Sequence, residues 1–141
     1  MENTISYMLR SLAMKYRYYA HNVLGKDKRT VSQDLAIYHI SQHMGLSQKD
    51  LVDKLGIKPA SVSSIVNQME SEGLIIRVQD EEDARKFKLL LTDKGQSLVP
   101  DVISSWQKIQ DEVTKGFTEE EKAELIRLLK QIDQNLEGLV H

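Results

Sequence analysis

Small polar side chains recur along residues 61–68, at positions left on the outer face of a predicted helix. They are Ser61, Ser63, Ser64, Asn67 and Gln68. Hydroxyl and amide groups of this size hydrogen-bond to base edges and phosphate oxygens in the major groove of DNA. Ser47, Gln48 and Lys58 complete the candidate DNA contacts of this stretch. The alternative is a helical hairpin inside an all-α core, with the Ser and Asn side chains merely solvated.

Two short helices joined by a turn at Gly56 would position these side chains. Their inward-facing apolar positions are Leu51, Leu55, Ile57, Val62, Ile65, Val66 and Met69. Two amphipathic helices around a turn glycine are typical of a helix-turn-helix. The second helix of such a pair commonly enters the major groove of DNA.

The predicted ends of these two helices carry residues that stabilise helix termini. Ser47 and Asp50 have the spacing of a capping box and predict where the first helix starts. Pro59 suits the first turn of the second helix, because its missing N–H has no bond to make there. Gly73 predicts the C-cap of the second helix.

A β-hairpin is predicted directly after Gly73. Two runs with strand character, residues 74–78 and 86–91, flank a charged turn. A hairpin in this place is a wing, which reaches toward the minor groove, where the negative potential attracts arginine. Arg85 is the candidate for minor-groove insertion. The basic candidate DNA contacts of the hairpin are Arg77, Arg85, Lys86 and Lys88.

The turn of this hairpin contains four consecutive acidic residues, 80–83. Clustered carboxylates can bind a cation or transfer protons, but an exposed hairpin tip supplies no desolvation to raise a carboxyl pKa. No neighbouring His or Cys completes a metal site. We therefore expect Asp80 and Asp83 to brace the turn through backbone N–H groups and through nearby arginines, Arg77 or Arg85.

The length of 141 residues predicts one domain with its own core. No segment is long enough and apolar enough to span a membrane, and the N-terminus lacks a signal-peptide pattern, so a cytoplasmic protein is expected. The chain has no cysteine, which excludes disulfides, thiol redox sensing and zinc–thiolate sites. No nucleophile–base constellation is visible, so we expect no enzymatic activity and no cofactor.

The charge of the chain is unevenly distributed. The net charge is −2, and residues 101–141 alone carry −4, so the first hundred residues carry +2. This mild positive charge predicts that DNA affinity depends on a few well-placed Lys and Arg side chains and on two copies acting together.

The outer segments are predicted to form long amphipathic helices, over residues 4–24, 92–115 and 118–139. Pro100 predicts a kink or a break in the second of these. Thr118 and Glu121 predict a capping box at the start of the third. Their leucine-rich faces need a partner, which a second copy of the chain would supply.

Histidines and tyrosines offer two further hypotheses. His39 and His43 stand four residues apart on a predicted helix that ends near His43, a spacing that could hold a metal ion with further ligands. We expect surface or cleft histidines instead, because no third ligand is apparent. The tyrosines of residues 4–24 fit core or dimer packing, and one or two of them could line a pocket for an aromatic effector.

Three segments resemble the multiple-antibiotic-resistance regulator (MarR) family of winged-helix transcription factors: the helix-turn-helix of residues 45–75, the wing D-x-x-D-x-R at Asp80, Asp83 and Arg85, and L-T-D-K-G at residues 91–95. The resemblance implies a mainly α fold with a small β-hairpin wing. It implies a DNA-binding lobe at about residues 31–92, flanked by dimerisation helices at about 1–24 and 93–141.

The resemblance also implies a function. A homodimer would bind a pseudo-palindromic operator, with one recognition helix per half-site in the major groove and Arg85 in the minor groove. A small aromatic or anionic effector would bind a cleft that draws on Tyr16, Tyr19, Tyr38, His39 and Trp106. Ser64 stands where many relatives have a basic residue, which shifts the expected contacts toward the wing.

Our leading hypothesis is therefore a dimeric repressor that releases double-stranded DNA when an effector binds. One alternative is a winged-helix module that docks a protein partner, because the wing is nearly neutral. Another is a metal-responsive regulator that uses His39 and His43. Steeply salt-dependent binding to duplex DNA would favour the dimeric repressor over both alternatives.

Overall fold

The structure, a computed structural model, describes residues 1–23 and 29–140. Its elements are α1 (Ile5–Val23), α2 (Val31–Gln42), β1 (Leu46–Ser47), α3 (Gln48–Leu55), α4 (Pro59–Ser71), β2 (Ile75–Gln79), β3 (Phe87–Leu91), α5 (Asp93–Val113) and α6 (Glu119–Leu139). The predicted mainly α fold with a small hairpin is confirmed. The predicted end of the first helix, Leu24, lies outside the described residues. The chain divides into two compact units, Met1–Gln107 and Lys108–His141.

The helix-turn-helix consists of α3 and α4. Gly56 joins them in the left-handed conformation, with φ of 64°, which a residue without a side chain adopts at little cost. The capping box of Ser47 and Asp50 is present, and Pro59 is the first residue of α4. The C-cap of α4 is Glu72, and Gly73 follows it with φ of 75°, so the predicted C-cap is one residue too late, while the predicted starts of both helices are confirmed.

The hairpin of β2 and β3 follows α4 as predicted. Its register pairs Ile75 with Leu91 and Gln79 with Phe87. A third strand, β1, pairs antiparallel with β3 and gives the sheet order β1-β3-β2. The two residues of β1 were not predicted, because a strand of this length has no periodicity of its own.

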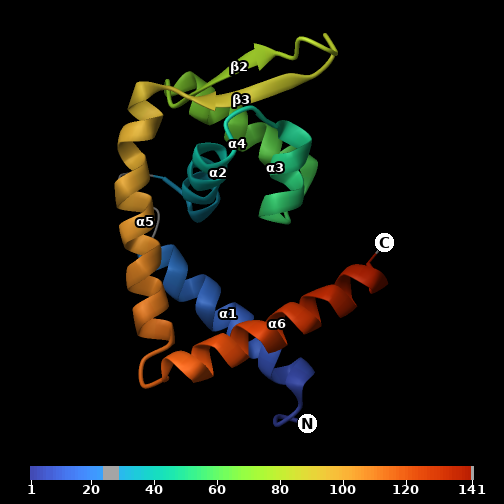
Figure 1. Ribbon diagram of the computed structural model, residues 1–141, viewed down its shortest axis with the longest axis vertical. Coiled ribbons are helices and arrows are strands. Elements are labelled where there is room, and N and C mark those ends of the chain that lie inside the picture. The colour runs from blue at the N-terminus through green and yellow to red at the C-terminus, as the bar shows by residue number, and fades with distance from the viewer. Residues whose placement is uncertain (24–28, 141) are drawn as a thin grey trace. The chain divides into compact units, whose positions relative to one another are not determined.

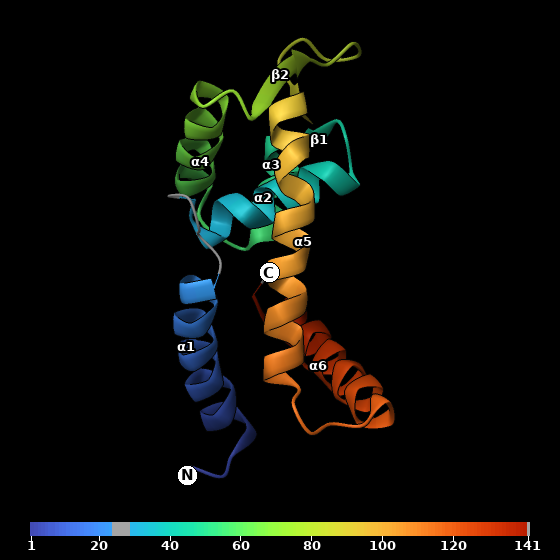
Figure 2. The ribbon, with the colours of Figure 1, turned by 90° about the vertical axis from the view of Figure 1, so that its left-hand side faces the viewer.

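The core lies between this sheet and helices α2, α3 and α4, which lie together on one side of the hairpin (Figure 1). Its completely buried side chains come from all of these elements and from α5: Ile37, Ile40, Leu51, Val62, Val66, Met69, Ile75, Leu89 and Val102. The turn of the hairpin projects beyond the three helices in both ribbon views (Figure 1, Figure 2). One chain thus holds the recognition helix and the wing on a common core.

The start of α2 is fixed by polar contacts as well as by the core. Thr30 and Gln33 form a reciprocal capping box. Arg29 Nε donates to Asp34 Oδ1 at 2.8 Å, and both side chains are almost fully buried. The desolvated ion pair joins the segment before α2 to the first turn of that helix.

Helix α5 runs without interruption through Pro100, so of the predicted kink or break, the break does not occur. A proline removes one N–H from the hydrogen-bond ladder, but packing on both sides of it can hold the helix together. Gly95 and Val102, on either side of Pro100, are both buried, whereas Pro100 itself is exposed.

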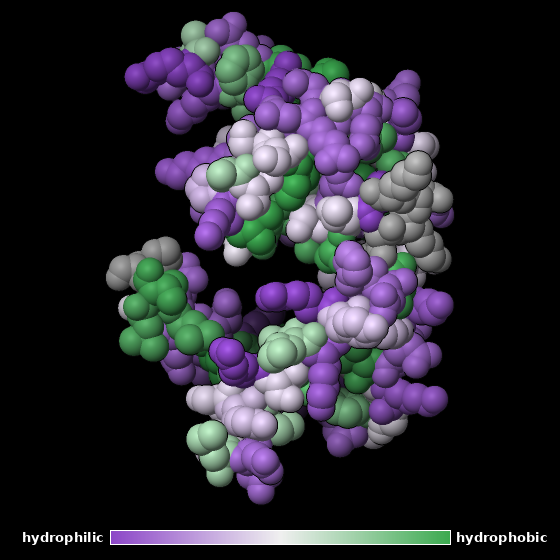
Figure 3. All heavy atoms as spheres, turned by 180° about the vertical axis from the view of Figure 1, so that it is seen from behind, coloured by the Kyte–Doolittle hydropathy of each residue, from purple (hydrophilic) through white to green (hydrophobic). Residues whose placement is uncertain are grey.

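Helix α6 begins with the predicted capping box, formed by Thr118 and Glu121. None of its residues is buried in the single chain. Exposed apolar side chains gather at its C-terminal end, which Figure 3 shows as a green patch; they are Leu136, Leu139 and Val140. None of the described helices combines the length and the hydropathy needed to cross a lipid bilayer.

Candidate nucleic-acid interface

Helix α4 separates its apolar and polar residues cleanly. Val62, Val66 and Met69 are completely buried. On the opposite side, the exposed polar residues are Ser61, Ser64, Asn67 and Gln68, and Ser63 is half-buried. The structure therefore brings four of the five predicted α4 contacts together on a solvent-facing surface.

Some of these polar groups already have partners within α4. Ser64 Oγ donates to the Ala60 carbonyl at 3.2 Å, so its hydroxyl is left as an acceptor. Gln68 Nε2 donates to Glu72 Oε1 at 3.0 Å. Glu72 is not among the predicted contacts, although a residue four positions after Gln68 is a recognisable helical partner.

Arg77 contacts α4 and does not extend into solvent. Residues 75, 77 and 79 share one face of β2, and Ile75 on that face is buried. The Arg77 side chain is 26% exposed, with Nε 3.6 Å from Glu70 Oε2. Its Nη2 donates to Asn67 Oδ1. The structure thus joins two predicted DNA contacts, Arg77 and Asn67, to each other.

The wing turn is braced by two aspartates. Asp80 Oδ1 accepts hydrogen bonds from the backbone N–H groups of Glu82 and Asp83, at 2.8 and 3.3 Å. Asp83 Oδ1 accepts from the backbone N of Arg85 at 3.0 Å and from its Nε at 3.2 Å. Arg85, and not Arg77, is thus the arginine that braces this turn.

These contacts favour the charged form of both carboxyls. Backbone hydrogen bonds, the strongest from Glu82, lower the pKa of Asp80. Hydrogen bonds from the side chain and then the backbone of Arg85 lower the pKa of Asp83. Two anionic carboxylates therefore hold the turn at neutral pH, and neither has the raised pKa of a general acid.

The basic side chains of the wing lie at and beside this turn. The Arg85 side chain is 90% exposed, although it is paired with Asp83. Lys86 is exposed and Lys88 is half-buried. The backbone of Lys86 closes the turn by accepting from Asp80 N at 2.9 Å. An arginine on a braced and projecting turn is suited to enter a narrow groove.

Ser47, Gln48 and Lys58 stand at the N-terminal ends of α3 and α4. Ser47 Oγ accepts from Asp50 N at 3.0 Å, and the Asp50 carboxylate accepts from Ser47 N at 3.3 Å. Lys58 is the exposed N-cap residue of α4 and makes no side-chain capping bond. Helix N-termini attract phosphate oxygens, and an exposed lysine adds to that attraction.

The five predicted cleft residues lie on three helices of the first unit. Tyr38 and His39 meet edge to face on α2, with ring centroids 5.4 Å apart. Burial, followed by Lys54 and His43, lowers the pKa of His39, and burial raises that of Tyr16. No ring contact among the described residues joins Tyr16, Tyr19 or Trp106 to the α2 pair.

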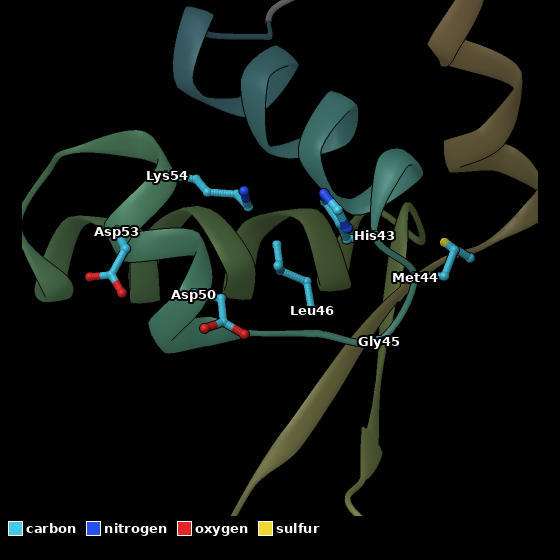
Figure 4. Close-up of a pocket in the computed structure, with 7 residues that line it drawn as sticks. All are labelled: His43, Met44, Gly45, Leu46, Asp50, Asp53 and Lys54. Atoms are coloured by element: carbon cyan, nitrogen blue, oxygen red, sulfur yellow. The ribbon is translucent and has the colours of Figure 1, made fainter. Parts of the chain in front are cut away.

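A shallow pocket of about 530 Å³ lies at the corner between α2 and α3. Figure 4 shows Asp50, Asp53 and Lys54 projecting from α3, while His43 and the three residues after it come from the connecting segment. None of the five predicted cleft residues lines this pocket. Within residues 1–23 and 29–140, no group of three or more His, Cys, Asp and Glu side chains could hold a metal ion.

Comparison with known proteins relates this geometry to a family. The family model for MarR matches residues 30–87. The chain is 25% identical to the HTH-type transcriptional regulator BilQ of Clostridioides difficile over 126 residues, which span 89% of this chain and 85% of that protein. It is 28% identical to the HTH-type transcriptional regulator MgrA of Staphylococcus aureus, over 82% of this chain and 78% of that protein.

A solved structure extends the similarity over almost the whole chain. A MarR-family transcriptional regulator from Listeria monocytogenes, in complex with a 26-mer DNA, superimposes with a TM-score of 0.86 and 27% identity, over 95% of this chain and 89% of that one. The region matched by the family model contains α2, the helix-turn-helix and the braced turn of the wing. Residues 30–87 of this chain therefore match the MarR family of transcriptional regulators, and the fold of that family extends over almost the whole chain.

Proposed function

We propose that this DNA-binding regulator acts as a homodimeric repressor of a pseudo-palindromic operator and that a small molecule relieves the repression. The observation that carries the proposal is the placement of two contact surfaces on one core. These are the polar face of α4 and the projecting wing turn that carries the exposed Arg85. The two surfaces suit adjacent major and minor grooves of one duplex.

In this arrangement α4 enters the major groove, and its polar face meets base edges and phosphates. Ser47, Gln48 and Lys58 approach the flanking phosphates from the helix N-termini, which favour anions. Arg85 extends into the neighbouring minor groove, and Lys86 and Lys88 neutralise phosphates beside it. Braced by Asp83, the arginine loses less side-chain freedom on binding than an unrestrained one would.

The terminal helices support dimerisation. On α6, Leu128 and Leu129 are each 45% exposed in the single chain, and on α1 Leu12 is 52% exposed. Apolar surface of this kind is favourable to bury, and a second copy would cover it symmetrically. The dimer would hold two recognition helices about 34 Å apart, one turn of duplex.

An effector would act by favouring a dimer in which the recognition helices no longer match that spacing. Its effect is limited to its difference in affinity for the two states. We propose that the pair Tyr38–His39 and Trp106 contribute to its site. The Trp106 Nε1 atom is buried and has no hydrogen-bond acceptor among the described residues, so a carboxylate or hydroxyl of the effector could supply one. Access to an operator implies a cytoplasmic protein.

Selection of bound duplexes from a random pool, followed by fluorescence anisotropy on the consensus, tests the proposal. A two-fold symmetric consensus and steeply salt-dependent binding are expected. Arg85→Ala is expected to weaken binding by about 1–3 kcal/mol while the dimer, measured by light scattering, stays intact. Lys130→Ala on α6 is the matched control, because it removes one positive charge outside the proposed DNA interface. An asymmetric consensus, a monomer at micromolar concentration, or equal losses in both variants would contradict the proposal.

A further inference from the structure

The contact between Arg77 and Asn67 fixes which way the Asn67 amide points. A guanidinium carries only hydrogen-bond donors, and an amide carries an acceptor oxygen and a donor nitrogen. The Asn67 oxygen must therefore face Arg77, as it does. The Asn67 Nδ2 group is then directed away from Arg77, on a side chain that belongs to the exposed face of α4.

Arg77 is held in this position by the sheet and by α4. Its place on the inward face of β2 directs it toward α4, and three quarters of its side chain is buried. Asn67 and Glu70 lie three residues apart on one side of α4, so a single guanidinium reaches both. The Glu70 carboxylate, 3.6 Å from Nε, offsets the positive charge. A paired and largely buried arginine is a poor phosphate contact.

We propose that Arg77 is a specificity-determining positioning residue, which orients Asn67 so that this side chain presents N–H donors to a base edge. The acceptors that it would read in the major groove are purine N7, guanine O6 and thymine O4. An unrestrained asparagine can instead pair with adenine through its oxygen and its nitrogen together. In this chain Arg77 already occupies one of the two lone pairs of that oxygen and holds it toward β2, which disfavours a further bond from the N6 amino group of adenine. The inference rests on the DNA-binding function proposed above.

Gln68 provides an internal contrast. Its Nε2 group donates to Glu72, so its oxygen is left as the outward acceptor, the opposite polarity to Asn67. Both members of this pair are exposed and lie four residues apart at the C-terminal end of α4, so little prevents the amide from turning over. Of these two amides, Asn67 is the one whose orientation is fixed by a residue from another element, Arg77 of β2.

The experiment compares the base preferences and the salt dependence of two charge-removing variants. Arg77→Gln and the matched control Lys86→Gln each remove one positive charge from the hairpin. Each is passed through the same random-pool selection as the wild type, and binding to the wild-type consensus is then titrated against salt concentration. Circular dichroism checks that each variant is folded.

The expected result separates the two residues. Arg77→Gln relaxes the preference at one base pair per half-site, from about tenfold in the wild type to within about twofold, and leaves the salt slope unchanged. Lys86→Gln keeps every base preference. It lowers the slope of log affinity against log salt concentration by about two per dimer, because each protomer loses one phosphate contact. Asn67→Ala relaxes the preference at the same base pair as Arg77→Gln does. The double variant shows no further loss of that preference.

Two outcomes would overturn the inference while leaving the proposed function intact. One is an unchanged consensus together with a reduced salt slope in Arg77→Gln, which would make Arg77 an ordinary phosphate contact. The other is an unchanged consensus in Asn67→Ala, which decides the matter even if Arg77→Gln fails to fold. A wild-type protein that selects no duplex would overturn both the inference and the proposed function.

Discussion

The helix-turn-helix and hairpin differ from helices α1 and α6 in how they bury apolar side chains. Leu51, Val62 and Val66 of the first region are completely buried in one chain. On α6 none of the residues is buried, and on α1 Ala20 alone is. The amphipathic patterns of the two regions are comparable in sequence. The difference therefore lies in whether the chain itself supplies the covering surface.

Polar contacts follow the same division. Where the first region meets the start of α5, they join separate elements: Thr92 Oγ1 donates to the Gly73 carbonyl at 2.6 Å, and Lys94 Nζ donates to the Glu72 carbonyl at 2.9 Å. On α6, the ion pair of Arg127 with Glu124 joins residues three positions apart. Contacts of the first kind fix tertiary geometry, whereas those of the second kind only support a helix.

A pair of identical substitutions provides the strongest test of this contrast. Leu51→Ala removes a completely buried side chain and is expected to lower the free energy of unfolding by about 2–5 kcal/mol at any protein concentration. Leu129→Ala acts on a side chain that is 45% exposed, so its cost is expected to appear only through the dimer. Urea denaturation at two protein concentrations measures both. A concentration-independent loss for Leu129→Ala would refute the contrast.

Gly95→Ala tests how tightly the first region is packed. A Cβ at this position would lie 2.2 Å from the Leu74 carbonyl oxygen, so the start of α5 must move away from the segment between α4 and β2. We expect a loss of about 1–3 kcal/mol in unfolding free energy. Gly138→Ala on α6 is the control, because a Cβ there meets no atom within 4 Å and should leave unfolding unchanged or slightly improve the helix. Equal effects of the two substitutions in denaturation curves would argue against the proposed difference in packing.

The capping boxes allow a smaller comparison. Ser47→Ala removes the cap of α3 and should lower the free energy of unfolding by about 1 kcal/mol. Thr118→Ala removes the equivalent bond from α6, whose exposed first turn contributes less to cooperative unfolding. Amide hydrogen exchange should then increase locally at Glu121, where the bond is lost. A global increase in exchange would contradict this expectation.

The smallest expected effect is a local response of the wing to acid. Asp80 and Asp83 have lowered pKa values in the folded protein, so their bonds stabilise the turn above the unfolded pKa of about 3.9 and are lost as the pH falls through the folded values. NMR titration of the Glu82 and Arg85 amides should follow these lowered pKa values, while amides of the buried core do not respond at the same pH. Titration of the Glu82 amide above pH 3.9 would show that Asp80 does not brace the turn.

Local rules were sufficient for several elements of this chain. Ser47, Gly56 and Pro59 each act on their own helix end through local backbone geometry. Their effects can therefore be predicted from the sequence. The alternation of residues 86–91 likewise predicted β3. The same holds for the contacts at the wing turn, where Asp80 and Asp83 bond to groups at most three residues away.

Features that depend on distant parts of the chain were not predictable in this way. Strand β1 exists because β3 pairs with it from more than forty residues away. Of the kink or break predicted at Pro100, the break does not occur, because packing of α5 outweighs one lost backbone bond. The sequence predicts Arg77 as a DNA contact. The residues next to it in the chain do not indicate that α4 lies beside it and pairs with it.

The sequence by itself determined the order of the helices and the hairpin, the helix starts and the polar face of α4, because each depends on residues within a turn or two of one another. Only the tertiary structure decided which way β2 faces and hence that Arg77 meets Asn67 and Glu70. The reason is physical: a hydrogen bond between side chains of separate elements depends on sheet register and helix packing, and both are set by the buried core.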